Sequence, residues 1–168
     1  GALGLSAVMA AKVAGAEQII AIDRHANRLE LASQFGATTT LSGDPAELTA
    51  GIVEATGGGA DYAFDTTGNA AVVRASFEGL NNLGTLGMAG VGFGDIAFDF
   101  LSMIGGRTIT GVMEGDSTPN EFIPRLAQLN AEGRFPYDEL VTTYPIAEIN
   151  AAEAASADGS VIKPVLVF

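Results

Sequence analysis

The sequence predicts an α/β fold built on a doubly wound parallel sheet. From residue 3 to residue 89, short apolar runs typical of buried strands alternate with stretches typical of helices. This alternation is the pattern of a parallel sheet covered by helices. Glycine accounts for 22 of the 168 residues, as expected where many strand-to-helix turns are needed. A chain of this length suits one domain with a small attachment.

The N-terminal stretch predicts a glycine turn, a helix, and then a strand that ends in an acid. Residues 3–14 are rich in alanine and place apolar side chains on one face, and Gly15 is suited to end that helix. Residues 19–22 form a continuous apolar run, as in a strand buried on both faces, and Asp23 follows it. We take this stretch as the part around which the other elements are arranged.

This order of elements is typical of a Rossmann unit, where G-x-G-x-x-G follows a strand and a carboxylate comes about 20 residues later. Gly1 and Gly4 match the last two glycines, and Asp23 lies 22 residues beyond Gly1. Bare backbone and a helix N-terminus suit a pyrophosphate, while a carboxylate accepts from ribose hydroxyls and repels a 2′-phosphate. The alternative left open is an ordinary βαβ unit that binds no cofactor, in which the glycines serve helix packing and Asp23 caps the next helix.

The sequence begins inside this motif, without its first glycine or the strand before it. We therefore expect a piece of a longer protein that lacks the first strand of the fold. In the 3-2-1-4-5-6 strand order that strand is central. Its neighbours would keep unpaired N–H and C=O groups unless a strand from elsewhere fills the place.

The next elements follow from turn and cap residues. Residues 27–35 predict a helix that Gly36 ends, and residues 38–41 predict a short strand. A helix over 45–56 begins at an Asp-Pro pair and ends at three consecutive glycines, 57–59. No Lys-Ser or Lys-Thr pair follows these glycines, so they indicate a helix stop rather than a phosphate loop.

The second half of the alternation predicts a strand over 61–65, a helix over 69–80 and a strand over 84–89. Thr66 and Thr67 come at the carboxyl end of the first of these strands, which faces the ligand crevice in an open parallel sheet. The glycines at 90, 92 and 94 leave two interpretations open: backbone that approaches a flat ring, or a flexible loop.

Residues 96–100 alternate with period two, which predicts an exposed edge strand that pairs with another chain. Residues 108–112 predict a further strand. From residue 114 the composition changes: prolines separate helices over 121–131 and 146–156, a connector over 133–137, and a closing strand over 161–168. We divide the chain into a dinucleotide-binding domain, 1–113, and a C-terminal segment, 114–168, which packs elsewhere in the parent protein.

Charge and composition exclude several functions. The formal net charge of −12 argues against nucleic acid or anionic membrane as a partner, because both need clustered cations. A dinucleotide is still allowed, since backbone amides and one cation can hold its phosphates. The sequence has no cysteine, and His25 is the only histidine. We therefore expect neither a disulfide framework nor a zinc site here.

Seven short motifs in order resemble the coenzyme-binding half of medium-chain, zinc-type alcohol dehydrogenases. Residues 114–117 and 133–138 are in turn similar to the aryl-alcohol (benzyl-alcohol) dehydrogenase branch. The seven motifs are Gly1-Ala2-Leu3-Gly4-Leu5, Ala21-Ile22-Asp23, Phe35-Gly36-Ala37-Thr38, Phe64-Asp65-Thr66-Thr67-Gly68, Ala89-Gly90-Val91, Gly106-Arg107-Thr108-Ile109-Thr110-Gly111 and Ile162-Lys163-Pro164-Val165-Leu166.

The resemblance implies NAD as the cofactor. Asp23 would select NAD, although the neighbouring Arg24 could accommodate the 2′-phosphate of NADP. The resemblance places Arg28 beside the adenosine ribose and Lys163 near the pyrophosphate. The remaining implied contacts run from the pyrophosphate to the wall of the nicotinamide pocket: Gly1, Ala2, Leu3, Gly4, Thr66, Thr67, Ala89, Gly90, Val91 and Val112.

The resemblance also implies that catalytic zinc, its cysteine and histidine ligands, and the proton relay belong to an N-terminal half that this chain lacks. The chain alone should not oxidise an alcohol, because hydride transfer needs the metal as well as the cofactor. His25 is not a replacement, since it lies in the loop beside Asp23. The implied parent is a cytoplasmic homo-oligomer, acting on a small alcohol or aldehyde and joined through residues 96–100.

Two other functions stay open at this point. One is a nucleotide-binding or redox-sensing module that performs no chemistry. The other is an S-adenosylmethionine-dependent methyltransferase, which also pairs a glycine turn with an acid after its second strand. Titration with NAD, NADP and S-adenosylmethionine separates the methyltransferase from the other two functions, and a parent sequence without upstream cysteines would favour the binding module.

Overall fold

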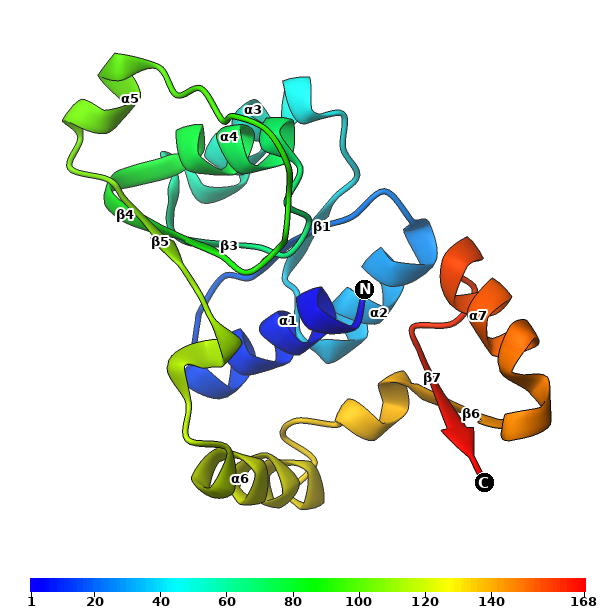
Figure 1. The fold of residues 1–168 in the computed structure, drawn as a ribbon. Coiled ribbons are helices and arrows are strands. Elements are labelled where there is room, and N and C mark those ends of the chain that lie inside the picture. Colours follow the sequence, from blue (N-terminus) through cyan, green and yellow to red (C-terminus); the bar gives the residue numbers. More distant parts are fainter.

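The computed structural model describes all 168 residues, and helices alternate with parallel strands along most of the chain (Figure 1). The helices are α1 Ala2–Ala14, α2 Ala26–Phe35, α3 Pro45–Thr56, α4 Ala70–Glu78, α5 Phe100–Ile104, α6 Pro119–Ala131 and α7 Ile149–Asp158. The strands are β1 Ile20–Ile22, β2 Thr39–Leu41, β3 Ala60–Asp65, β4 Leu80–Met88, β5 Thr108–Gly111, β6 Val141–Pro145 and β7 Lys163–Val167. The α/β class predicted from the sequence is confirmed.

The strands form three separate parallel groups: β1 with β2, β3 with β4 and β5, and β6 with β7. No strand is hydrogen-bonded between β1 and β3, which are the neighbours that the missing first strand would separate. Aromatic side chains on β3 are correspondingly uncovered, with Tyr62 81% exposed and Phe64 45% exposed. The predicted interruption of the sheet is therefore present.

Local signals place the helix ends where the sequence predicts them. Gly15 and Gly57 end α1 and α3 in the left-handed conformation, with φ of 85° and 71°. Glycine adopts this conformation without the cost that a Cβ adds. At the start of α3, the Asp44 side chain accepts a hydrogen bond from the Ala46 N–H.

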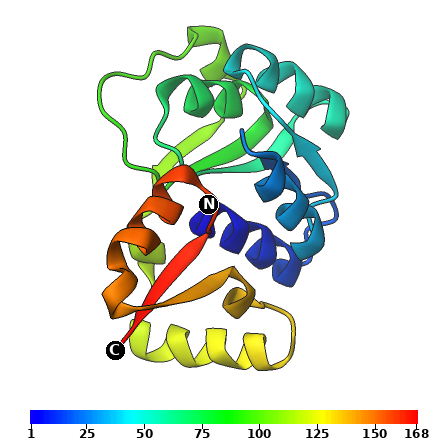
Figure 2. The same cartoon turned by 90° about the vertical axis from the view of Figure 1, so that its right-hand side faces the viewer.

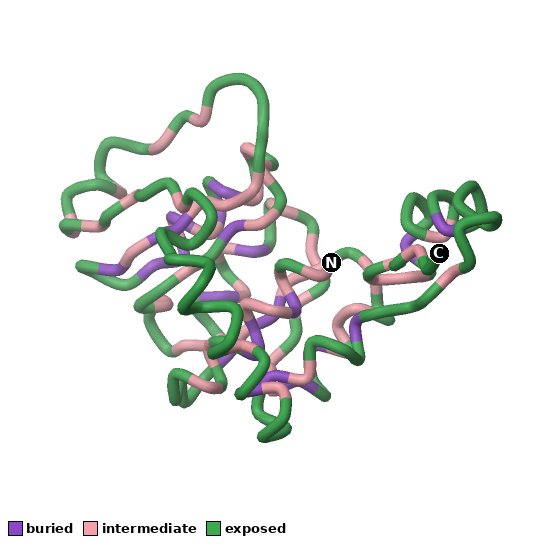
Figure 3. Tube along the Cα trace, turned by 60° about the horizontal axis from the view of Figure 1, so that its bottom comes forward, coloured by how far each residue is buried: buried purple, intermediate pink, exposed green.

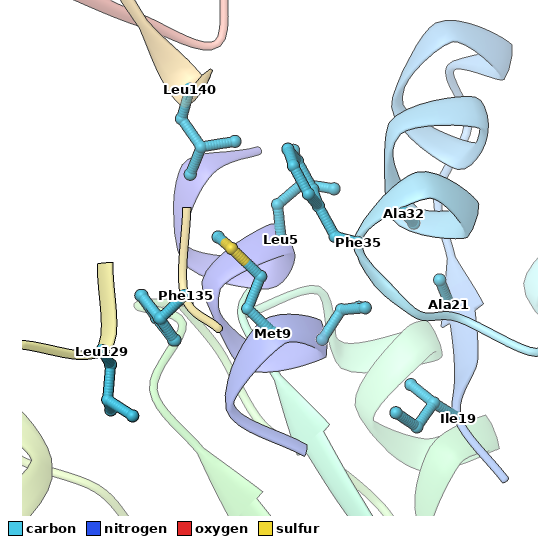
Figure 4. Close-up of a cluster of buried hydrophobic side chains, with 10 residues drawn as sticks. Leu5, Met9, Ile19, Ala21, Ala32, Phe35, Leu129, Phe135 and Leu140 are labelled. Atoms are coloured by element: carbon cyan, nitrogen blue, oxygen red, sulfur yellow. The ribbon is translucent and has the colours of Figure 1, made fainter. Parts of the chain in front are cut away.

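Two apolar clusters hold the fold together. The larger joins α1, β1 and α2 to residues of the C-terminal segment, so that Leu5 and Met9 share one core with Leu140 (Figure 4). The smaller is formed by Val73, Phe77, Leu80 and Leu86 beneath the three-stranded group. Figure 3 shows buried residues concentrated in the body of the molecule and few in the part formed by β6, α7 and β7.

The expected edge strand over 96–100 is wrong. Residues 96–99 form no strand, and helix α5 begins at Phe100. The Asp99 side chain accepts a hydrogen bond from the Leu101 N–H, which caps this helix. Phe98 packs against Phe77 with ring centroids 4.7 Å apart. The alternation of residues 98–100 thus reflects one half-buried ring and a helix cap. Because residues 96–100 form no strand, they cannot join two subunits as an edge strand.

The C-terminal segment contains an additional strand that the sequence reading missed. Residues 141–145 form β6, which pairs in parallel with β7 from Val141↔Lys163 to Pro145↔Val167. The β-branched run Val141-Thr142-Thr143 was the available signal. Figure 2 shows β6 and β7 side by side, with α7 connecting them. None of the helices is both long and apolar enough to cross a membrane.

Candidate cofactor site

The carboxyl ends of β1, β3 and β4 bring most of the predicted site residues into one row. At one end, the Gly1 amino nitrogen lies 3.5 Å from the Asp23 carboxylate. In the middle, a Cβ placed on Gly4 would lie 3.5 Å from Thr66 Oγ1. At the other end, a Cβ on Gly90 would touch the backbone of residues 66–68. The row therefore runs from Asp23 across the start of α1 to the turns after β3 and β4.

The start of α1 offers hydrogen-bond donors that no protein group uses. The first helical bond runs from the Leu5 N–H to the Gly1 carbonyl, so the N–H groups of Ala2, Leu3 and Gly4 have no partner within the helix. No side chain caps this end, and its first turn carries no acid. A helix N-terminus in this condition suits an anion.

Asp23 and Arg28 form the adenosine end of the predicted site. Asp23 Oδ1 accepts a hydrogen bond of 3.0 Å from the His25 N–H. Its other oxygen lies 3.9 Å from Arg28 Nη1, and the two side chains are 22% and 21% exposed. Arg24 is exposed. The carboxylate thus keeps acceptor capacity beside a cation, as recognition of a diol requires.

The turns after β3 and β4 are held by Asp65, which the sequence reading did not assign to the site. Asp65 is 4% exposed, and its carboxylate accepts from the Thr67 N–H, the Thr67 hydroxyl and the Gly68 N–H at 3.2, 2.7 and 2.8 Å. The Asp65 carbonyl also accepts from the N–H groups of Ala89 and Gly90. The signal was an acid ending an apolar strand immediately before Thr-Thr-Gly.

Three glycines let these two turns lie against each other. A Cβ on Gly68 would lie 2.3 Å from the Val91 carbonyl oxygen, and one on Gly92 would lie 2.0 Å from the Gly68 carbonyl oxygen. No real Cβ approaches backbone so closely, so Gly68, Gly90 and Gly92 are required by packing. They present Val91 at the surface, where it is 85% exposed.

Two predicted residues lie outside the contacts of this row. Val112 follows β5, and its N–H donates to the Met88 carbonyl. Lys163 is exposed at the start of β7 and makes no ion pair or side-chain hydrogen bond. A cavity of about 350 Å³ lies at the other end of α1, lined by Lys12, Phe35 and Arg134 among others. It does not coincide with the row.

The donor set fits a dinucleotide and does not fit a metal ion. Unpartnered helix N–H groups suit phosphate oxygens, and a carboxylate with acceptor capacity suits ribose hydroxyls. The structure contains no group of three or more His, Cys, Asp or Glu side chains arranged to hold a metal ion.

Comparison with known proteins agrees with this geometry. A family model described as zinc-binding dehydrogenase matches residues 2–131. Geraniol dehydrogenase of Castellaniella defragrans is 39% identical over 176 residues, covering all of this chain and 46% of the relative. Alcohol dehydrogenase class-3 of Myxine glutinosa is 36% identical over 173 residues, covering 99% of this chain and 46% of the relative. The chain thus spans about half the length of these relatives.

Solved structures match the whole fold as well. An alcohol dehydrogenase zinc-binding domain protein from Burkholderia ambifaria superposes with a TM-score of 0.95 at 46% identity, over 99% of this chain and 46% of the other. Benzyl alcohol dehydrogenase from Acinetobacter calcoaceticus superposes with a TM-score of 0.94 at 41% identity, over 99% and 47% of the two chains. The arrangement of elements is therefore shared in full with about half of each of these proteins.

Proposed function

The chain belongs to the zinc-binding dehydrogenase family, and on that premise we propose that it is the NAD-binding portion of an alcohol dehydrogenase. The observation that carries the proposal is the unused set of N–H donors at the start of α1, placed beside Asp23 at the end of β1. A pyrophosphate and the ribose next to it need these two groups at this separation in the chain.

Each part of the row has a role in this proposal. The N–H groups of Ala2, Leu3 and Gly4 bind the pyrophosphate, and Asp23 and Arg28 bind the adenosine ribose. Thr66 and Thr67 flank the adenosine. Bound NAD supplies the hydride acceptor, and the backbone of residues 89–91 with Val112 forms the wall beside its nicotinamide. Lys163, exposed at the start of β7, is assigned to the neighbourhood of the pyrophosphate.

We assign zinc, and the groups that polarise the substrate oxygen, to a separate catalytic half of the parent enzyme. We propose that this chain binds the coenzyme and that alcohol oxidation needs the catalytic half as well, because hydride transfer requires the metal-polarised substrate oxygen in addition to the coenzyme. We further propose that the C-terminal segment, 114–168, packs partly on that catalytic half. The exposed face of β6, α7 and β7 is available for this contact.

We propose a primary aromatic alcohol, or its aldehyde, as the substrate of a cytoplasmic, oligomeric parent enzyme. The likeness of residues 114–117 and 133–138 to aryl-alcohol dehydrogenases supports the substrate class, and the structural likeness to benzyl alcohol dehydrogenase agrees with it. Light scattering of the purified parent enzyme measures its oligomeric state. Comparing kcat/KM for benzyl alcohol and for a short aliphatic alcohol tests the substrate class.

Calorimetric titration of the parent enzyme with NAD, NADP and S-adenosylmethionine tests the proposed function. We expect NAD to bind at least about tenfold more tightly than NADP, because Asp23 repels the 2′-phosphate. Asp23→Asn should weaken NAD binding and reduce the difference in affinity between NAD and NADP. Asp61→Asn, at an exposed position on β3, should change neither the NAD affinity nor that difference. Tight binding of S-adenosylmethionine, or no uptake of NAD, would overturn the proposal.

A further inference from the structure

We propose that Gly159, the buried turn residue between α7 and β7, is a positioning residue for the adenosine end of the coenzyme site. By having no side chain, it leaves room for the Arg28 guanidinium to lie beside Asp23. The inference rests on the proposed function, since it names a residue far away in the sequence that adjusts the same site.

The contact itself is direct. A Cβ on Gly159 would lie 3.0 Å from Arg28 Nη2 and 3.8 Å from His25 Cε1. Gly159 is buried, although the residues on either side of it are exposed. Figures 1 and 2 both place the junction of α7 and β7 beside the start of α1 and α2. The C-terminal segment therefore forms one wall of the space that Arg28 occupies.

The Arg28 guanidinium also has hydrogen-bonding capacity that the protein does not use. Its Nε is buried and has no hydrogen-bond partner. It pairs with Asp23, whose carboxylate oxygen lies 3.9 Å from Nη1, a distance longer than a hydrogen bond. A guanidinium carries five N–H donors, and buried donors without partners are uncommon. An acceptor-rich ligand beside Asp23 would satisfy them.

The turn is built to keep this space open. Gly159 has φ of 78° and ψ of 9° and ends α7. The Asp158 carboxylate accepts from the Ser160 N–H at 2.8 Å, and the Val161 N–H donates to the Ala155 carbonyl. These bonds fix the direction of the chain on both sides of the glycine. A side chain at position 159 would consequently point at Arg28.

Two substitutions at position 159 should have graded effects on coenzyme affinity in the parent enzyme. Gly159→Ala adds one carbon, which shifts the guanidinium by a few tenths of an ångström, and we expect NAD affinity to fall about threefold. Gly159→Asn adds a larger group that tolerates the left-handed backbone, and we expect a fall of about tenfold or more. The affinity for adenosine diphosphate ribose, which lacks nicotinamide, should fall by the same factors.

Gly57 provides the matched control. It ends α3 in the same conformation, with φ of 71°, and a Cβ there would meet nothing within 4 Å. Ala or Asn at position 57 should lower the Tm through the same left-handed backbone cost and should leave NAD affinity within about twofold, because no site residue lies within 4 Å of the new Cβ. In an Arg28→Ala background, Gly159→Asn should have no additional effect on affinity.

The outcomes separate the inference from the proposed function. If the unmodified parent enzyme does not take up NAD, both fail. If it binds NAD and the position-159 variants bind as well as the position-57 variants, the inference alone is overturned. An additive effect of Gly159→Asn and Arg28→Ala would also overturn it, because Gly159 would then act without Arg28.

Discussion

The two ends of the site use a carboxylate in opposite ways. At the end formed by β3 and β4, Asp65 is buried and accepts three hydrogen bonds from its own chain. At the adenosine end, Asp23 accepts one backbone hydrogen bond and lies 3.9 Å from a guanidinium that no hydrogen bond satisfies. Both acids lie at the carboxyl ends of strands, Asp23 just after β1 and Asp65 as the last residue of β3, so sequence position does not distinguish their roles.

The difference between them shows how to assign a role to an acid in this fold. A carboxylate whose acceptor sites are filled by its own chain stabilises a turn, because its removal leaves buried donors unpaired. A carboxylate with unused acceptor capacity can bind a ligand at little cost to stability. Substitutions at one end should therefore change the free energy of unfolding, and those at the other end should change affinity.

The largest effect should come from the close approach of the two turns. In Gly92→Ala, the new Cβ would lie 2.0 Å from the Gly68 carbonyl oxygen, so backbone must move. We expect a loss of about 3 kcal/mol of unfolding free energy, at the upper end of the usual cost of overpacking, together with weaker NAD binding. Denaturant unfolding of the parent enzyme measures the loss. Gly111→Ala, with open space around its Cβ, should be neutral.

The next effect concerns the buried acid. Asp65→Asn turns one acceptor oxygen into an NH₂ group that faces the N–H donors of residues 67 and 68. We expect a loss of about 2 kcal/mol of unfolding free energy. Asp61→Asn on the same strand is the control, because Asp61 is exposed and accepts no hydrogen bond from a side chain or turn. If the two variants have the same free energy of unfolding, Asp65 does not stabilise its turn, and the proposed difference between Asp65 and Asp23 is wrong.

At the adenosine end, Arg28→Met should weaken NAD binding and leave the free energy of unfolding nearly unchanged. Methionine keeps the apolar stem and removes the charge and the donors. An ion pair at 3.9 Å with both partners about one-fifth exposed contributes little to folding. We expect the unfolding free energy to change by less than about 0.5 kcal/mol and NAD affinity to fall about tenfold, or about 1.4 kcal/mol.

Arg74→Met is the control for this variant. Arg74 pairs with Glu78 at 2.8 Å on the exposed face of α4, away from the site. Its substitution should leave NAD affinity unchanged. If Arg28→Met instead lowers the Tm and leaves affinity intact, the adenosine end is structural like the other.

Much of the fold could be predicted from local chemistry. Gly15 and Gly57 end helices, and Asp44 begins one, because caps depend on neighbouring residues only. The wrong strand at 96–100 arose from alternation that tertiary packing explains differently, since Phe98 packs on Phe77. A short segment can satisfy more than one pattern, and its partners decide which one forms.

That the proposed site residues lie near one another was predictable only where they follow the ends of strands. Asp23, Thr66 and Gly90 could be placed because parallel strands direct their carboxyl ends to one edge. The contact between Gly159 and Arg28 joins segments about 130 residues apart and depends on how α7 docks. No local pattern in the sequence specifies such a contact.

The smallest effect should come from a turn that repeats the Asp65 pattern at the surface. Asp158 accepts a hydrogen bond of 2.8 Å from the Ser160 N–H, as Asp65 accepts from the Thr67 N–H, but Asp158 is exposed and the Ser160 hydroxyl donates to the Ala155 carbonyl. The hydroxyl and N–H of Ser160 lower the pKa of Asp158 from its ordinary value of 3.8. The stabilisation this provides is present above that value and is lost as the pH falls through the lowered pKa.

Ser160→Ala should therefore raise the pKa of Asp158 toward its ordinary value, measured by titrating the carboxyl carbon signal by NMR. The Tm at pH 7 should fall by no more than about 2 °C, since water replaces the lost hydroxyl at an exposed site. Thr67→Ala should cost more, because the buried Asp65 loses a partner that water cannot replace. If the two alanine variants lose the same unfolding free energy, burial does not determine how much this kind of turn contributes to stability. The contrast between Asp65 and Asp23 would then need another cause.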